Sequence, residues 1–183
     1  MAETYDLFRS IQNRLFLKKL AAFIAAASTG GSDQSDKFYL GIMAMKNQDI
    51  GSQVLMVIDK VESANKAIMI GKLFRHFALG FLDKSEFDRS VFAVTQIFIA
   101  DFDYLTTLPK DLQSVPPQRK QQLYQSGLLD CPLEVIEDGG STNLDGKKYV
   151  LSELGTKFVN AVFDQNRQYR IYTDEELQRE LKV

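Results

Sequence analysis

Residues 63–105, SANKAIMIGKLFRHFALGFLDKSEFDRSVFAVTQIFIADFDYL, carry the clearest helical pattern in the chain. Apolar side chains recur every three or four residues, which predicts two amphipathic helices. The first stripe consists of Ala67, Ile70, Phe74, Phe77 and Phe81. The second consists of Phe87, Val91, Val94, Phe98, Phe102 and Leu105. Ser63 is typical of an N-cap, and Asp83 with Glu86 forms a capping-box pattern. The stretch therefore predicts a helical hairpin that turns at residues 80–83, with an unbroken second helix.

Further helices are predicted on the N-terminal side of this hairpin. Residues 5–27 show helical periodicity, and Gly30 and Gly31 follow as a helix end. Shorter helices are expected over residues 35–46 and 52–60. Within the hairpin, Gly71 interrupts an otherwise strong helix-forming segment. We expect Gly71 to mark a close crossing of two helices, where a missing side chain allows the backbones to approach.

The sequence changes character after Pro109, Pro116 and Pro117. A short helix is predicted over residues 118–125, with Pro117 in its first turn and Gly127 just beyond its end. Residues 132–138, PLEVIED, and 147–151, KKYVL, resemble two strands joined by the loop GGSTNLDG. Ser152 is placed to cap a helix over residues 153–163, and Thr173 with Glu176 to open a last helix.

The order of helix, strand, turn, strand and helix resembles the C-terminal half of a winged-helix domain. The family often shows the pattern Y-x-L-T-x-x-G, and residues 149–155 read YVLSELG, with Ser in place of Thr. The resemblance spans residues 108–163 and implies an architecture rather than a particular site. The predicted fold is therefore mainly α: a helical bundle with a C-terminal winged-helix-like module that contains one β-hairpin. The predicted divisions are a helical domain (1–108), the module (109–166) and a tail helix (167–183).

The helical part is similar to small bacterial proteins that share a Lys-Ala-x-x-x-Gly-Lys-Leu-Phe core. Here the match is carried by Lys66, Ala67 and residues 71–74. The resemblance implies a bacterial source and no particular activity.

Composition removes several function classes. His76 is the one histidine and Cys131 the one cysteine, so no zinc-type cluster, disulfide or ready catalytic pairing is expected. No Gly-rich phosphate-binding motif occurs, and we expect no cofactor, no metal and no catalytic residues. The acid pair Asp101 and Asp103 is interpreted as solvated helix-end residues. The apolar run after Lys18 and Lys19 is too short for a membrane span and has the wrong flanks for a signal peptide, so a cytoplasmic protein is expected.

If the module binds DNA, helix 118–125 would read the groove and the wing 133–150 would contact the backbone. The candidate nucleic-acid-binding residues are Arg119, Lys120, Gln122, Lys147 and Lys148. The charge balance counts against this use. From residue 113 onward, nine Lys or Arg face eleven Asp or Glu, and the whole chain has a net charge of −2.

The sequence thus favours a non-enzymatic bacterial interaction or regulatory protein that acts through protein–protein contacts. A DNA-binding transcriptional regulator is the alternative. The helix over residues 5–27 is the best candidate for contact with a partner, because it combines an apolar face with Arg14, Lys18 and Lys19. Core packing, self-association into an oligomer and contact with a membrane surface are its three possible uses, in decreasing order of expectation.

Overall fold

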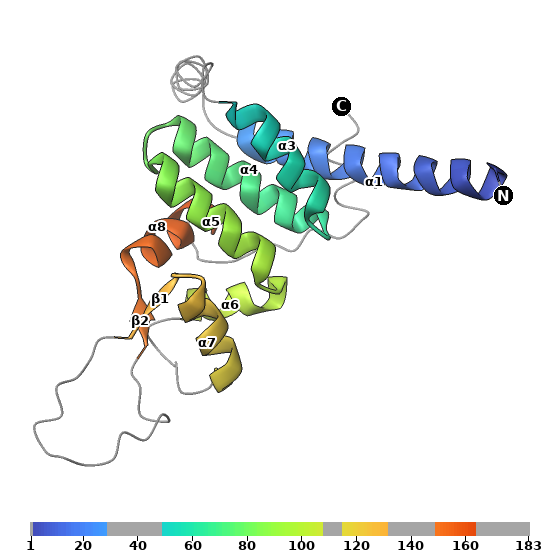
Figure 1. Ribbon diagram of the computed structural model, residues 1–183. Coiled ribbons are helices and arrows are strands. Elements are labelled where there is room, and N and C mark those ends of the chain that lie inside the picture. The colour runs from blue at the N-terminus through green and yellow to red at the C-terminus, as the bar shows by residue number, and fades with distance from the viewer. Residues whose placement is uncertain (1, 29–48, 108–114, 132–148, 164–183) are drawn as a thin grey trace, which may run out of the picture. The chain divides into compact units, whose positions relative to one another are not determined.

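The computed structural model describes residues 2–28, 49–107, 115–131 and 149–163 (Figure 1). These residues form a mainly α structure with one small antiparallel sheet, as predicted. The helices are α1 (Ala2–Ser28), α3 (Ile50–Lys60), α4 (Ala64–Ala78), α5 (Lys84–Gln96), α6 (Ile99–Thr107), α7 (Pro117–Gln125) and α8 (Glu153–Val162). The strands are β1 (Leu129–Asp130) and β2 (Val150–Leu151). The helices predicted over residues 35–46 and after Thr173 lie outside the described residues.

The chain divides into two compact units, and the boundary follows Phe87, inside α5. The described residues of the first unit are 2–28 and 49–87, and those of the second are 88–107, 115–131 and 149–163. The boundaries predicted between the helical domain, the winged-helix-like module and the tail helix lie at residues outside the described part. The predicted domain organisation therefore stays a prediction.

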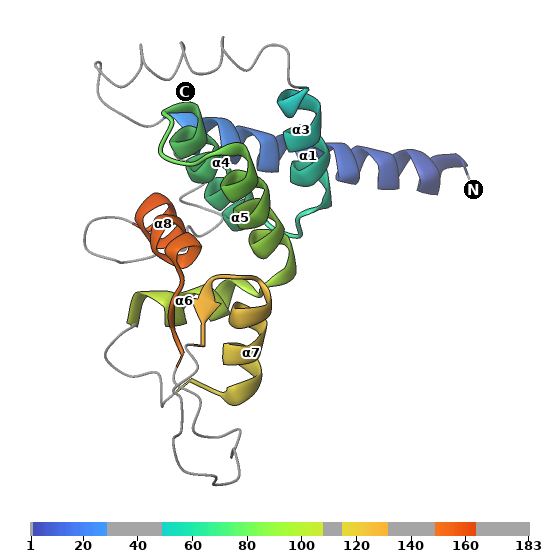
Figure 2. The same ribbon diagram turned by 60° about the vertical axis from the view of Figure 1, so that its left-hand side comes forward.

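The first unit is organised by the packing of α1 against α4, which Figure 2 draws crossing each other. Ala22 and Ala26 of α1 form a buried cluster with Ile68 of α4. At Gly71, an added Cβ would lie 2.5 Å from the Phe23 carbonyl oxygen and 2.9 Å from the Ala26 Cβ. The backbones therefore approach at a distance that only glycine allows, which confirms the crossing predicted at Gly71.

Two basic side chains fasten the ends of neighbouring helices in this unit. The buried Arg75 guanidinium donates to the Ala27 carbonyl in the last turn of α1 (3.2 Å). Lys19 donates from Nζ to the carbonyls of Asp59 (2.5 Å) and Val61 (3.0 Å) at the end of α3. Cations at helix C-termini satisfy carbonyls that have no partner within the helix and interact favourably with the helix dipole.

The predicted turn after α4 is confirmed, but Phe81, assigned to the apolar stripe of this helix, is not part of the core. Gly80, with φ of 80°, donates to the Phe77 carbonyl, and the Phe81 N–H donates to the His76 carbonyl. This is a Schellman turn, in which the residue after the glycine packs back on the helix. Phe81 accordingly lies against the His76 ring, with centroids 5.6 Å apart, and stays 64% exposed instead of entering the core.

The local capping predictions in this hairpin are confirmed. The side chain of Ser63 accepts from the Lys66 N–H at the start of α4. The Asp83 carboxylate accepts from the Glu86 N–H (2.8 Å), and the Glu86 carboxylate accepts from the Asp83 N–H (2.9 Å). This reciprocal pair is a capping box and fixes the start of α5.

The unbroken helix predicted from residue 84 to 105 is wrong, because α5 ends at Gln96 and α6 begins at Ile99. The Phe98 carbonyl accepts from the Asp101 N–H in a tight turn (2.9 Å). The break lets Ile97 and Phe102 both enter the core, whereas Phe98 is 62% exposed. No glycine or proline marks this position, so tertiary packing overrides the periodic pattern.

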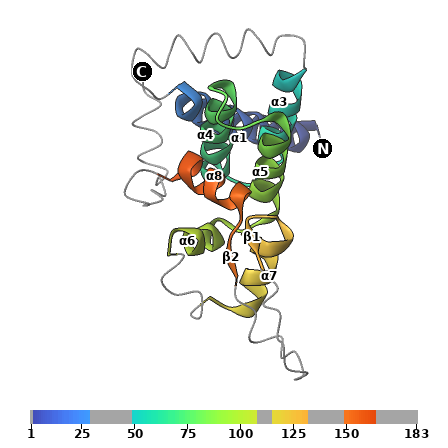
Figure 3. The ribbon, with the colours of Figure 1, turned by 90° about the vertical axis from the view of Figure 1, so that its left-hand side faces the viewer.

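The core of the second unit joins α6, α7, the sheet and α8 (Figure 3). Phe102 of α6 stacks on Phe158 of α8, with ring centroids 5.4 Å apart. The strands pair Leu129 with Leu151 and Asp130 with Val150. The predicted returning strand is confirmed at Val150–Leu151, whereas the first strand lies at Leu129–Asp130, ahead of the predicted PLEVIED segment. Residues 132–138 lie outside the described part.

Ser152 connects this sheet to α8 and to the end of α7, as its predicted capping role requires. Its hydroxyl donates to the Gly127 carbonyl (2.6 Å) and accepts from the Gly155 N–H (2.8 Å). Its own N–H donates to the Leu128 carbonyl (3.1 Å). Gly155 packs directly on that same carbonyl and has no room for a Cβ. The sheet, the cap and the helix start are therefore one connected structure.

We predict that Gly71→Ala destabilises the protein by about 1–3 kcal/mol, although alanine is the better helix former by about 1 kcal/mol. The added methyl group would force α1 and α4 apart at the Phe23 carbonyl. Urea unfolding followed by circular dichroism measures the change. Gly51→Ala is the matched control, because nothing lies within 4 Å of its Cβ position and the change should be neutral or stabilising. Equal stability of Gly71→Ala and the parent would contradict the prediction.

A second prediction concerns His76, whose Nδ1 lies 3.1 Å from the Lys72 carbonyl. Burial lowers the pKa of His76 below 6.5, and Arg75 and Lys72 act in the same direction against the effect of that hydrogen bond. The unfolded chain therefore binds this proton more readily, so stability is complete above about pH 6.5 and falls as the pH drops below it.

Because His76 is the one histidine of the chain, its ring proton signals in an NMR titration are unambiguous. The midpoint should lie below the value measured in the urea-unfolded protein. His76→Gln should flatten the loss of stability between about pH 6.5 and 5.5. A midpoint at or above that of the unfolded chain would contradict the expected direction.

Candidate functional site

Helix α7, the predicted recognition helix, begins at Pro117, one residue earlier than expected, and ends at Gln125. Proline in the first turn needs no hydrogen-bond partner for its nitrogen and presets a helical φ. At the other end, Gly127 has φ of 79° and donates to the Tyr124 carbonyl, while the Leu128 N–H donates to the Leu123 carbonyl. Leu123 and Leu128 are both buried. This second Schellman turn anchors α7 firmly in the second unit.

Arg119 on α7 is held by an ion pair. Its Nη1 lies 2.7 Å from Oδ2 of Asp101, whose side chain is 4% exposed in the first turn of α6. The guanidinium also lies over the Phe98 ring, 5.5 Å from the centroid. The interpretation of Asp101 as a solvated acid is therefore wrong: it is a buried partner that needs Arg119. Asp103 is exposed, as expected, and partial burial raises the pKa of its carboxyl.

The described residues bring together three of the five candidate nucleic-acid-binding residues, because all three lie on α7. Arg119 contacts Asp101 and Phe98, Lys120 is half-buried, and Gln122 is exposed. Lys147 and Lys148 lie outside the described residues. Of the two basic residues on α7, Arg119 and Lys120, Arg119 therefore already pairs with an acidic side chain of the protein itself.

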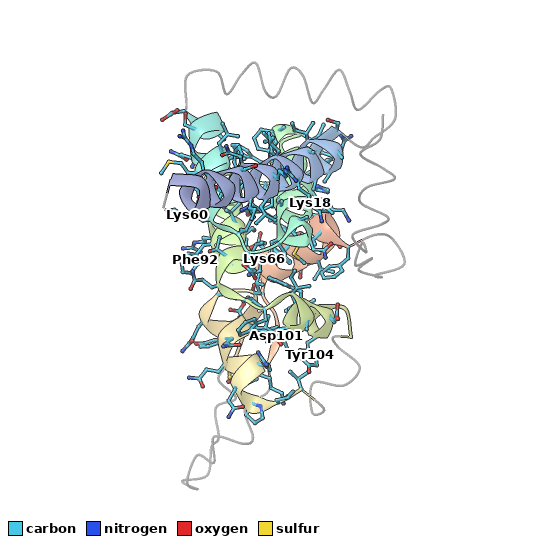
Figure 4. The ribbon with its side chains drawn as sticks, turned by 90° about the vertical axis from the view of Figure 1, so that its right-hand side faces the viewer. Lys18, Lys60, Lys66, Phe92, Asp101 and Tyr104 are labelled. Carbon is cyan, nitrogen blue, oxygen red and sulfur yellow. The ribbon has the colours of Figure 1, made fainter. Side chains whose placement is uncertain are left out.

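A cavity of about 300 Å³ lies between the C-terminal halves of α5 and α7. Its lining consists of Phe92, Gln96, Ile97, Gln122, Gln125 and Ser126. None of these side chains carries a charge. Phe92 is 57% exposed, and Figure 4 shows it on the outer side of α5. The cavity was not predicted from the sequence, although Gln118, Gln122 and Gln125 recur at helical spacing along one face of α7.

The N-terminal part of α1 forms a second exposed feature, in the first unit. Ile11 and Leu15 are 48% and 56% exposed. They lie on the same helical stripe as Ala22 and Ala26, which are buried against α4. Figure 1 shows this part of α1 extending beyond α3 and α4. We call residues 9–17 the α1 overhang. The helical stripe that packs on α4 at Ala22 and Ala26 continues into this segment, where no described residue covers it.

The charge of the α1 overhang has one sign. Arg9 and Arg14 are exposed, and no Asp or Glu occurs between residues 9 and 20. Leu17 is also exposed, but on another side of the helix from Ile11 and Leu15. Apolar side chains are therefore not segregated onto one face, as they are in a helix that lies in a membrane surface. Within the described residues, no helix is long and apolar enough to span a bilayer.

Groups suited to bind a metal do not gather in the part of the chain that the structure describes. No set of three His, Cys, Asp or Glu side chains lies close enough together there to hold an ion. Cys131 is a free, half-buried thiol that follows β1. His76 packs on Phe81 at the end of α4.

Comparisons with known proteins give no relative for this fold or these sites. No family model matches the chain, and no curated protein or solved structure matches it either.

We predict that Arg119→Ala destabilises the protein by about 2–3 kcal/mol, because it leaves the buried Asp101 carboxylate unpaired. Adding Asp101→Asn should recover part of this loss, since the neutral amide tolerates burial better than the carboxylate. Lys120→Ala, at the next position on α7, should change stability by less than about 0.5 kcal/mol. Urea unfolding of the three variants measures the pattern. Equal effects of Arg119→Ala and Lys120→Ala would contradict the structural role of Arg119.

Proposed function

We propose that this protein is a non-enzymatic interaction protein that acts through protein–protein contacts, with the α1 overhang as its docking surface. The observation that carries the proposal is the exposure of Ile11 and Leu15 on the stripe that α1 otherwise buries. A helix gains stability in a protein chiefly by packing an apolar face. The overhang lacks a described neighbour for that face, and a partner would supply one.

The partner that fits the overhang is an amphipathic helix with acidic flanks. Ile11 and Leu15 stand one turn apart, which suits an apolar stripe at helical spacing on the partner. Arg14, three residues after Ile11 and next to Leu15, borders this stripe and would lie near an acidic side chain, whereas Arg9 lies on nearly the opposite side of the helix. A basic partner, including a parallel second copy of the same segment, would place like charges together. Electrostatic complementarity of this kind raises the association rate and excludes wrong partners.

DNA binding through a winged-helix-like module is the second proposal, and it has weaker support. The order α7, β1, β2, α8 agrees with such a module. The ion pair between Arg119 and Asp101 counts against the use of α7 as a recognition helix, because phosphate contact would have to compete with a buried carboxylate. Many folds serve several functions, so the architecture alone does not favour DNA.

Two synthetic helical peptides test the proposed partner chemistry. Both carry the same leucine stripe, and they differ only in glutamate or lysine at the flanking positions. Fluorescence anisotropy with the full-length protein should show at least tenfold tighter binding of the glutamate peptide, with a difference that shrinks as salt is raised. The double variant Ile11→Glu/Leu15→Glu should lose this binding by tenfold or more, because it removes the apolar contact and cancels the positive charge of Arg9 and Arg14.

Leu17→Glu is the matched control, since it makes the same change within the overhang but on a different side of the helix. It should retain most of the binding that the double variant loses. Equal binding of both peptides, or an equal loss in both variants, would overturn the proposal. A dimer in light scattering that Leu15→Glu dissolves would identify a second copy as the occupant and would also overturn it.

A further inference from the structure

The cavity of the second unit has a lining that is polar yet uncharged. Three glutamines, Gln96, Gln122 and Gln125, line it together with the buried Ile97 and the exposed Phe92. The Ser126 hydroxyl donates to the Leu123 carbonyl (2.7 Å), and its lone pairs stay available as acceptors. The lining therefore combines amide groups with an aromatic ring and an aliphatic wall.

The glutamine side chains indicate which chemical groups a ligand of this cavity would carry. Gln122 and Gln125 each carry two N–H donors and one carbonyl acceptor, whereas Gln96 already donates from Nε2 to Thr95 Oγ1 (3.4 Å). Such groups pair best with a ligand group that both donates and accepts. The lining offers a charged ligand no opposite charge, so it favours an uncharged one. At about 300 Å³, the cavity is at the lower end of ligand-binding pockets and holds about one side chain with its peptide units.

A peptide fits these features better than a nucleotide does. A stacked base would also suit Phe92, but a nucleotide brings phosphates, and Arg119 is held by Asp101. Phe98 and Tyr124, also in this unit, are exposed aromatic residues of the kind enriched in protein interfaces.

We propose that this cavity binds a short uncharged segment of a partner protein. One apolar or aromatic side chain of that segment packs on Phe92 and Ile97, and its main-chain amides pair with the three glutamine carboxamides. This site belongs to the second unit and does not depend on the α1 overhang. Its success or failure in a binding experiment is therefore separate from the function proposed above.

The probe is N-acetyl-phenylalanine N-methylamide, a neutral molecule with two peptide amides and one aromatic side chain. Titration into the full-length ¹⁵N-labelled protein should shift the side-chain amide signals of Gln96, Gln122 and Gln125 and reach saturation. The methyl ester analogue, which lacks one N–H donor, should bind about threefold to tenfold more weakly. The corresponding glutamate and lysine derivatives, and adenosine as the nucleobase probe, should bind at least tenfold more weakly.

Gln122→Leu and Phe92→Ala should each weaken binding of the phenylalanine amide by about threefold to tenfold. Gln121→Leu is the matched control: Gln121 is exposed on the same helix but does not line the cavity, and the affinity should be unchanged. Backbone amide spectra of each variant verify that the unit stays folded. The proposal is overturned if the phenylalanine amide does not bind, if charged derivatives or adenosine bind as well, or if Gln121→Leu weakens binding as much as Gln122→Leu.

Discussion

The contact between Gly71 and the backbone of α1 is the constraint on which the first unit depends. A Cβ at this position would meet the Phe23 carbonyl oxygen and the Ala26 side chain, so α1 and α4 pack with their backbones nearly touching. That approach brings the Arg75 guanidinium within reach of the Ala27 carbonyl and the Phe23 ring within 5.6 Å of Phe74. It also leaves the first part of α1 without a described neighbour, because α1 is longer than the surface that α4 offers. The exposed stripe at Ile11 and Leu15 is thus a consequence of where the crossing lies.

The second unit also depends on a glycine that packs directly on the backbone of a neighbouring segment. Gly155 packs on the Leu128 carbonyl, and Ser152 hydrogen-bonds to the backbone on both sides of that contact. A two-residue pair of strands would be marginal on its own. Here each short element is tied to a helix end: β1 follows the Schellman turn of α7, and β2 leads directly into the cap of α8. This anchoring fixes the end of α7 from which Gln122 and Gln125 line the cavity.

Sequence patterns predicted those features that depend on neighbours along the chain. The caps at Ser63 and Ser152, the capping box of Asp83 and Glu86, and the close crossing at Gly71 all follow from local rules. The break between α5 and α6 could not be predicted in this way, because the periodic pattern continues through it, whereas in the structure Ile97 and Phe102 enter the core and Phe98 does not. The candidate sites were predictable only in part. The apolar residues of α1 could be read from the sequence, whereas the cavity depends on two helices that are distant in the sequence.

The distribution of paired charges explains why the net charge of the chain is a poor guide to its partners. Lys19 and Arg75 fasten helix ends, Lys66 is buried beside Glu62 (2.7 Å), and Arg119 neutralises Asp101. These cations count in the formal charge but act within the fold, so a sequence-wide sum does not describe the charge that each surface offers for binding. The exposed arginines of the α1 overhang, Arg9 and Arg14, lie in a stretch without acids. A chain with a net charge of −2 can therefore present a basic, apolar surface at one end of α1 and an uncharged cavity beside α7. Two surfaces of such different polarity favour two different partner segments rather than one extended polyanion.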